Sequence, residues 1–466
     1  MSDTLNKVRT FLESPLYPVF IGAVVLVSHI FALEAICAPI IVLSCMLVLV
    51  LCESAEYAIA PIVLFTYLLS REHTPTTPTY SNYLLSPLPL TVIILMCIGL
   101  LAACVYFFIK GGRYRQIKLR GEPIFTSLLI FILTLFASAL LSGEYLSSNL
   151  AFAAVEACAF IIPFMLFRFG IPKNRNSAEL CERLSYVALV SSGVIVLELV
   201  HLYMSADIFI GGSLNKEAIT LGWGIWNSVG GMLTLALPPL FLGAVKTKHT
   251  ALYLSAAVIT YVSAVLTLSR NALLFGTLIF GVCCIVCAVI GKKKKIFRWF
   301  LLSLVGVVAV FVLVFSSKIA DILADYINRG FSDNGRFALW EASASAFFEN
   351  VFSGVGFHAY SGDYYQFAAF MPKLPHNTPL ALLGGGGILV FGAYAAYRIF
   401  TILPFIKRPS LYKTLLGLTV LMLIMQSLLD NFIFNFYPTF MYTAAICIAL
   451  RANEEATSAP IALDKI

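Results

Sequence analysis

SSKIADILADYINRGFSDNGRFALWEASASAFFENVFSGVGFHAYSGDYYQFAAFMPKLPHN, residues 316–377, is the one long segment of this chain that is too polar to lie in a lipid bilayer. The segments on either side are hydrophobic runs with short connections. Of the 466 residues, 60% are hydrophobic and only 12% are charged, whereas soluble domains carry about 25% charged residues. We therefore expect an integral membrane protein whose main extramembrane part is this segment.

The hydrophobic runs have the length that a membrane-spanning helix needs, about 20 residues. They predict an all-α, polytopic membrane helix bundle with about 14 transmembrane helices, or about 12 if the short second and third runs are not spans. The expected spans are 16–35, 37–52, 56–70, 88–109, 123–142, 147–168, 184–204, 221–244, 250–268, 271–290, 297–315, 378–400, 411–429 and 434–451. Residues 1–315 and 378–466 then form the membrane part, with a short cytoplasmic tail, and 316–377 form one large extracytoplasmic loop.

The distribution of lysine and arginine predicts how the bundle is oriented. Basic residues gather in alternate loops, as positive-inside topology requires if the N-terminus is cytoplasmic. These loops contain Lys110 to Arg120, Lys173 and Arg175, Lys246 and Lys248, Lys292 to Arg298, and Lys407 to Lys413. Both termini are therefore expected in the cytoplasm and residues 316–377 outside it. Because this topology accounts for the net charge of +7, no nucleic-acid partner is expected.

The loop is predicted to contain a helix from about Arg336 to Asn350. Asn334 or Asp333 can cap it, and an apolar stripe recurs at helical spacing along it. The stripe consists of Phe337, Trp340, Ala344, Phe347 and Phe348. Arg336 lies in the first turn, where free backbone N–H groups and the helix dipole already favour an anion.

Two further polar residues are expected at the same side of the membrane. Arg270 lies in the very short turn of LTLSRNALLFG, between two apolar runs that leave it little room to extend away from the protein. His376 precedes Asn377 at the start of the next span. Taken singly, such an arginine is more often an interfacial residue than a ligand, and such a histidine is more often a capping residue than a base.

Together, two arginines and a histidine suit a particular chemistry. A guanidinium forms two parallel charge-assisted hydrogen bonds with phosphate, and a histidine can accept a proton from an attacking hydroxyl. Arginines can also replace a cation in neutralising a diphosphate. The outer loops contain no Asp-X-Asp, His-Glu-X-X-His or cysteine pair, so we expect neither a metal nor a cofactor. The 11 cysteines lie mainly in the hydrophobic runs and indicate small core residues.

The span after His376 reads TPLALLGGGGILVFGAYAAY and contains four consecutive glycines, Gly384 to Gly387. In a membrane helix such small residues allow neighbouring helices to approach closely. We therefore expect a packing contact here rather than a hinge.

These motifs, in their order, resemble the O-antigen ligase and O-antigen polymerase superfamily of bacterial membrane glycosyltransferases. The similar pieces are LTLSRNALLFG around Arg270, DNGRFALWEASASAFFENVFSGVGFHAY around Arg336, and PHNTPLALLGGGGILVFGAY after His376, with WNSVGGMLTLALPPLF upstream. The resemblance covers roughly residues 220–400. One departure is Gly385, which stands where members of the family often have an acidic residue.

The resemblance implies a metal-independent, inverting enzyme of the bacterial cytoplasmic (inner) membrane with an extracytoplasmic active site. Its donor would be an undecaprenyl-diphosphate-linked glycan, and its acceptor a glycan or lipid-linked hydroxyl, as in ligases or in polymerases. By resemblance, Arg270 and Arg336 would hold the diphosphate, and His376 would activate or position the acceptor. Asn377 and Asp430 are further candidate substrate-binding residues, and membrane lipids surround the bundle. The alternative is a polysaccharide transporter or a flippase for lipid-linked glycans, which would need charged groups through the bundle.

Overall fold

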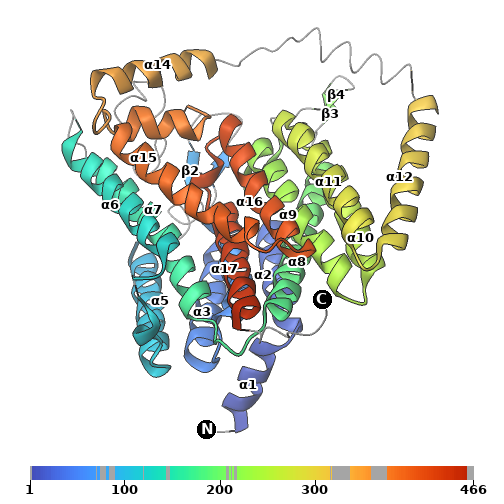
Figure 1. Ribbon diagram of the computed structural model, residues 1–466, viewed down its shortest axis with the longest axis horizontal. Coiled ribbons are helices and arrows are strands. Elements are labelled where there is room, and N and C mark those ends of the chain that lie inside the picture. Colours follow the sequence, from blue (N-terminus) through green and yellow to red (C-terminus); the bar gives the residue numbers. More distant parts are fainter. Residues whose placement is uncertain are drawn as a thin grey trace, which may run out of the picture.

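Helices make up most of the protein, as a computed structural model shows (Figure 1). The structure describes residues 3–69, 71–73, 80–82, 90–118, 120–142, 147–205, 209–210, 213–214, 218–314, 316, 336–357 and 375–458. The caps expected at Asp333 and Asn334, and most of the remaining expected loop, lie outside these residues. The fold class predicted from the sequence, an all-α membrane bundle, is confirmed.

The first half of the chain forms helices that run up and down the bundle. They are α1 (Asp3–Glu13), α2 (Leu16–Phe31), α3 (Glu34–Leu51), α4 (Ile59–Leu69), α5 (Leu90–Lys110), α6 (Pro123–Leu141), α7 (Ser147–Phe169) and α8 (Ser177–Ser205), with the 3-10 helices η1 (Ala55–Ala58) and η2 (Arg113–Gln116). Three small antiparallel pairs connect helices: β1 (Arg71–His73) with β2 (Tyr80–Asn82), β3 (Phe209–Ile210) with β4 (Ser213–Leu214), and β5 (Thr220–Leu221) with β6 (Gly224–Ile225).

The second half adds the core helix and the elements around the site. They are α9 (Trp226–Lys246), α10 (Thr250–Leu266), α11 (Arg270–Ile290), α12 (Lys294–Val314), α14 (Arg336–Glu349), α15 (Thr378–Ile406), α16 (Leu411–Leu429), η5 (Phe432–Phe434) and α17 (Phe436–Ser458). Figure 1 shows α14 lying across the top of the bundle, above α15.

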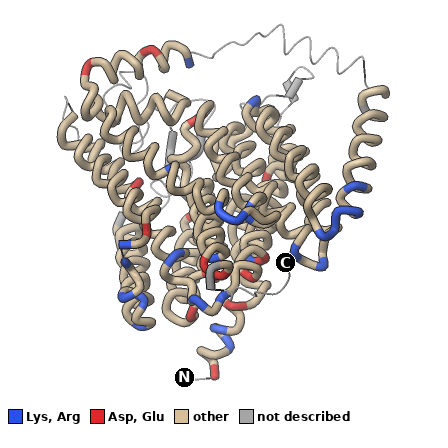
Figure 2. The backbone as a smooth tube through the Cα atoms, in the orientation of Figure 1, with Lys and Arg blue, Asp and Glu red and all other residues tan. Residues whose placement is uncertain are grey.

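Each of the fourteen expected spans corresponds to one helix. Among the described residues, 10 helices are long and apolar enough to cross a membrane, or up to 11 if α1 and α2, bent by 78° at their junction, count as one span. Two of the expected spans are short apolar helices, Ala55–Tyr67 and Thr250–Leu266. Figure 2 shows most of the lysine and arginine residues in the lower half of the bundle, at the end opposite α14.

Helix α9 lies at the centre of the bundle, since 94% of the apolar stretch that could cross the membrane is buried inside the protein. Two glycines in its first turns let other elements approach closely. A Cβ atom on Gly230 would lie 2.7 Å from the Cβ of Ala272, and one on Gly231 would lie 2.5 Å from the ring of Phe432. The start of α11 and the segment after α16 are therefore held against the same end of α9.

Helix α15 is broken at Gly387, whose φ of 64° and ψ of −168° are not helical. Residues 351–357, which follow α14, are inserted at the break. Val355 and Gly356 donate backbone N–H bonds of 3.0 Å to the carbonyls of Gly384 and Gly385. Below the break, Ile388 and Leu389 donate to the carbonyls of the inserted segment at 2.9 and 3.3 Å. The break thus loses few backbone hydrogen bonds, as a break at membrane depth requires.

The packing contact expected at Gly384 to Gly387 is present in two parts: Gly384 packs on Ser343 of helix α14, and the glycines nearer the break pack on the inserted segment. The inserted segment comes so close that a Cβ atom on Gly354, at φ +67°, would lie 2.5 Å from the carbonyl carbon of Gly385. Helix α6 supports the same junction, because the hydroxyl of Ser138 donates to the carbonyl of Ser353 at 2.7 Å. The segment that carries the loop helix is in this way fixed to the membrane bundle.

The helix expected from about 336 to 350 is confirmed as α14, but its packed face differs from the expected stripe. Ser343 and Ala346 are the buried residues, and the hydroxyl of Ser343 donates to the carbonyl of Leu380 at 2.9 Å. Phe337 and Phe348 from the expected stripe are exposed. Small side chains face α15 because its glycine-rich half comes very close: a Cβ atom on Gly384 would lie 2.7 Å from the carbonyl of Ser343.

Gly387→Ala should destabilise the protein by at least about 2 kcal/mol. Alanine is strained at positive φ, and its Cβ would lie 2.4 Å from the carbonyl oxygen of Phe352. The matched control is Gly392→Ala on the same helix, where an added Cβ meets nothing within 4 Å and should stabilise by about 0.5–1 kcal/mol. Thermal unfolding in detergent measures both, and equal melting midpoints would contradict the role assigned to the break.

Candidate functional site

The C-terminal end of α16 collects residues from three other parts of the chain. The last carbonyls of a helix have no partner within the helix and lie at the negative end of its dipole, so they favour donors and cations. The carbonyl of Leu429 accepts a hydrogen bond of 3.0 Å from Nη1 of Arg336 and one of 3.3 Å from Nδ2 of Asn271. The carbonyl of Leu428 accepts one of 3.0 Å from Nδ2 of Asn377.

His376 and Asp430 form a pair beside these contacts. Nδ1 of His376 lies 3.0 Å from Oδ1 of Asp430, and the same oxygen accepts the backbone N–H of Asn431 at 2.8 Å. Both side chains are partly exposed, His376 by 34% and Asp430 by 20%. A substrate can therefore reach the pair.

The backbone around His376 fixes where its ring points. His376 has a φ of 52°, in the left-handed region, which turns the chain immediately before α15 begins. Asn377 then caps the helix, since its side-chain oxygen accepts the N–H of Leu380 at 3.0 Å. On the other side, Nε1 of Trp340 donates to the carbonyl of Pro375 at 2.8 Å. Helix α14 therefore contributes Arg336 and also holds the residue before His376.

The charge state of Asp430 decides which nitrogen of His376 carries the proton. Burial by itself would raise the pKa of Asp430, but the hydrogen bond from His376, its charge, the N–H of Asn431 and the charge of Arg336 together lower it below its usual range. An ionised carboxylate only accepts hydrogen bonds, so Nδ1 of His376 must donate. In the neutral ring, Nε2 is then the unprotonated nitrogen, and it can accept a proton from a hydroxyl.

Arg270 is the first residue of α11, directly after the capping Ser269, whose hydroxyl accepts the N–H of Ala272 at 3.3 Å. Its side chain is exposed. The next residue, Asn271, is buried and bonds to the carbonyl oxygen that Arg336 also contacts. The structure thus brings Arg336, His376, Asn377 and Asp430 to the end of α16 by direct hydrogen bonds, and Arg270 through its neighbour.

Sequence reasoning missed Asn271 and the positioning role of Trp340. Asn271 could have been identified because it directly follows Arg270 in the short turn of LTLSRNALLFG. Trp340 was assigned only to an apolar stripe, although a tryptophan in such a position usually needs an acceptor for its N–H. Asn377, which we expected to bind substrate, uses its amide as a cap and as a link to α16.

The arrangement can bind an anion and move a proton. Arg336, at the start of α14, and Arg270, at the start of α11, supply positive charge. The His376–Asp430 pair supplies a base. Among the described residues, no three histidine, cysteine, aspartate or glutamate side chains lie together as a metal site would require.

Comparison with protein families adds a second line of argument. Residues 255–395 match a family model described as O-Antigen ligase. The match supports the O-antigen ligase superfamily and includes Arg270, Arg336, His376 and Asn377, whereas Asp430 lies beyond it. A search of curated proteins found no match.

Asp430→Asn should reduce stability at neutral pH by about 1–3 kcal/mol, since His376 and Asn431 lose a charged acceptor. Because the pKa of Asp430 is lower in the folded protein, this contribution is complete above the usual pKa of aspartate, about 3.9. It is lost as the pH falls through the folded-state pKa.

Melting midpoints of the wild type and Asp430→Asn between about pH 3 and 7 measure this dependence. The two midpoints should differ at the upper end and converge as the pH falls below about 3.9. Glu341→Gln on the exposed face of α14 is the control, with no expected difference. A gap that does not shrink as the pH falls below about 3.9 would contradict the ionised state assigned to Asp430.

Proposed function

From the O-antigen ligase match over residues 255–395, we propose that the protein transfers a polyprenyl-diphosphate-linked oligo- or polysaccharide to an acceptor hydroxyl. The reaction takes place at the outer face of the bacterial cytoplasmic membrane. The family match supports glycan transfer of the O-antigen ligase kind. The observation that carries the finer proposal is the convergence of Arg336 and the His376–Asp430 pair at the end of α16.

In this proposal the two arginines stabilise the diphosphate leaving group. As the bond between the anomeric carbon and the diphosphate oxygen breaks, negative charge grows on the diphosphate, and preformed donors aimed at it lower the barrier. Arg336 and Arg270 provide planar guanidinium groups that match the phosphate oxygens. Arg270 and Arg336 are the first residues of α11 and α14, so the packing of these helices fixes where the two side chains begin.

In this proposal His376 activates the acceptor hydroxyl. Its Nε2 accepts the proton of the acceptor hydroxyl while the oxygen attacks the anomeric carbon from the side opposite the diphosphate. One carbon–oxygen bond forms and one breaks, the polyprenyl diphosphate leaves, and the configuration inverts. Asp430 acts through His376, because it holds the ring and stabilises the imidazolium that forms.

The orientation follows from the distribution of charge. Most lysine and arginine residues lie in the half of the bundle opposite α14 (Figure 2), and the positive-inside rule assigns that end to the cytoplasm. Both termini are then cytoplasmic, and the site faces outward. The donor is an undecaprenyl-diphosphate-linked glycan. The acceptor is either a different molecule, as for a ligase, or a second lipid-linked glycan, as for a polymerase.

Arg270→Ala, Arg336→Ala and His376→Ala should each reduce the transfer rate by about 100-fold or more, the usual effect of removing one group that stabilises the transition state. Arg270→Lys and Arg336→Lys should lose at least about tenfold, because a point charge does not replace the guanidinium fork. Rates are measured in proteoliposomes with an undecaprenyl-diphosphate glycan and candidate acceptors.

Arg115→Ala is the matched control, an exposed arginine of η2 that stacks on Tyr114 and donates to its hydroxyl at 3.1 Å. Lipid-linked donor should accumulate on the outer leaflet in cells that carry the inactive variants. Accumulation on the inner leaflet would favour the alternative, a flippase or transporter. Full activity of both lysine variants would contradict diphosphate binding.

We also propose that the transfer is independent of metal ions, because two arginines can neutralise the diphosphate as a divalent cation would. Transfer should therefore continue at an unchanged rate in excess chelator. The measurement compares initial rates with and without chelator in the same proteoliposomes. Loss of activity that magnesium or manganese restores would refute this part of the proposal.

A further inference from the structure

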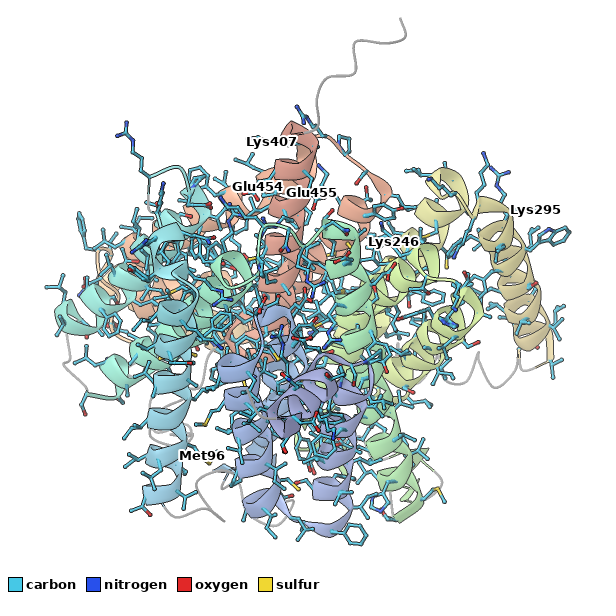
Figure 3. The ribbon with its side chains drawn as sticks, turned by 90° about the horizontal axis from the view of Figure 1, so that it is seen from below. Met96, Lys246, Lys295, Lys407, Glu454 and Glu455 are labelled. Carbon is cyan, nitrogen blue, oxygen red and sulfur yellow. The ribbon has the colours of Figure 1, made fainter. Side chains whose placement is uncertain are left out.

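A cavity of about 690 Å³ opens at the end of the bundle opposite the site. Its distance from the site follows from α9. The first turns of α9 contact the start of α11, whereas Lys246, the last residue of the 21-residue helix, lines the cavity. A helix of this length spans about 30 Å. Figure 3 views the molecule from this end and labels Lys246.

Several elements form the walls of this cavity: the bend between α1 and α2, η1, the start of α8, and the link between α9 and α10. The lining residues are mostly charged or tyrosine side chains, among them Glu56, Tyr57, Arg175, Arg183, Lys246 and Lys248. Such a lining differs from the apolar surface of the rest of the bundle. It does not contribute to the site at the end of α16.

Arg183 is a residue of this cavity whose charge is only partly compensated, by the charge of Glu56. Its guanidinium stacks on the ring of Tyr57, 4.8 Å from the centroid. Its Nε and Nη2 are buried and find no hydrogen-bond partner in the described part of the chain. Unsatisfied donors on a buried charge are costly and rare in native proteins, and an unseen water or ion often explains them.

The neighbouring carboxylates are engaged by other cations. Glu56 and Glu179 lie 3.3 and 3.4 Å from Arg175, and the carboxylate of Glu13 accepts a hydrogen bond of 2.9 Å from Arg9. Glu182 is exposed at the rim.

The remaining cations of the lining are Arg183, Lys246 and Lys248. Nζ of Lys246 lies 3.7 Å from the ring centroid of Tyr412, and Lys248 is exposed. Four cations and four carboxylates line the cavity in all, so its formal charge is balanced. Among the described residues, three of the carboxylates form ion pairs, whereas Arg183, Lys246 and Lys248 form none.

We propose that this cavity binds a phosphate group, with Arg183 as its anchor and Lys248 at its rim. A phosphate has enough acceptor oxygens to satisfy several guanidinium donors at once, and its negative charge complements cations that have no ion-pair partner in the described part of the chain. The group belongs either to the headgroup of an anionic membrane lipid or to a free phosphate, because the cavity lies at the ends of membrane helices. The proposal does not depend on the transfer reaction.

The test uses the full-length protein in detergent without added lipid. It is titrated separately with inorganic phosphate, with phosphatidylglycerol in mixed micelles, and with diacylglycerol as the lipid without phosphate. Thermal melting midpoints and native mass spectrometry report binding. A saturable rise with inorganic phosphate identifies a free phosphate. A rise with phosphatidylglycerol alone, without one for diacylglycerol, identifies a lipid headgroup.

Arg183→Gln should weaken the binding of whichever ligand responds by at least about tenfold, the usual loss of affinity when one charged hydrogen bond is removed. Arg115→Gln, an arginine that stacks on Tyr114 away from the cavity, should bind as the wild type does. Without ligand, Arg183→Gln should melt at or above the wild-type midpoint, because it removes a charge that is only partly compensated. With saturating ligand the order should reverse, which a purely structural role would not produce.

If Arg183→Gln does not fold, Lys248→Gln replaces it, since this exposed side chain can be changed without disturbing the core. It should weaken binding by about threefold, in line with one partly exposed charge. The proposal is overturned if neither phosphate nor phosphatidylglycerol shifts the wild-type midpoint. It is equally overturned if the cavity variants bind as tightly as the wild type.

Discussion

A backbone group inside a membrane must find a hydrogen-bond partner within the protein, and this constraint explains how the outer part of the chain is held. The break of α15 at Gly387 leaves carbonyl and N–H groups without partners in their own helix. The segment after α14 supplies them, with bonds to Gly384 and Gly385 above the break and to Ile388 and Leu389 below it. Helix α14 is therefore attached to the bundle through backbone bonds rather than through a large apolar contact.

The site depends on this attachment and on a second helix end. The α14 segment places Arg336 near α16, and the half of α15 above the break begins at Thr378, with the capping Asn377 and then His376 before it. The end of α16 then connects them, because its last carbonyls accept hydrogen bonds from residues of α11, α14 and α15. Three segments that are far apart in sequence share the end of α16 as a partner, and Asp430, the residue directly after α16, contributes its side chain.

Much of this could be predicted from the sequence. Length and hydropathy were sufficient to place a helix in each expected span, although 10, or up to 11, of the described helices are long and apolar enough to cross a membrane. Helical periodicity was sufficient for α14. Arg270, Arg336 and His376 could be selected because most lysine and arginine residues lie at the opposite end of the bundle (Figure 2). The break in α15 could not be predicted, since four glycines allow a close helix contact as readily as an inserted loop. The carbonyls of α16 leave no trace in the sequence, because every residue has one.

The way α16 contributes to the site has a consequence for how such proteins diverge. Backbone carbonyls are independent of residue type, so the side chains of Leu428 and Leu429 are free to vary with the lipid or helices that they face. The information that specifies the site is carried instead by the segments that supply the donors. A contiguous piece from Arg336 to Leu389 contains α14, the inserted segment and both sides of the α15 break. It is therefore a natural unit of exchange between related chains, provided that the recipient keeps an acidic residue at the end of α16.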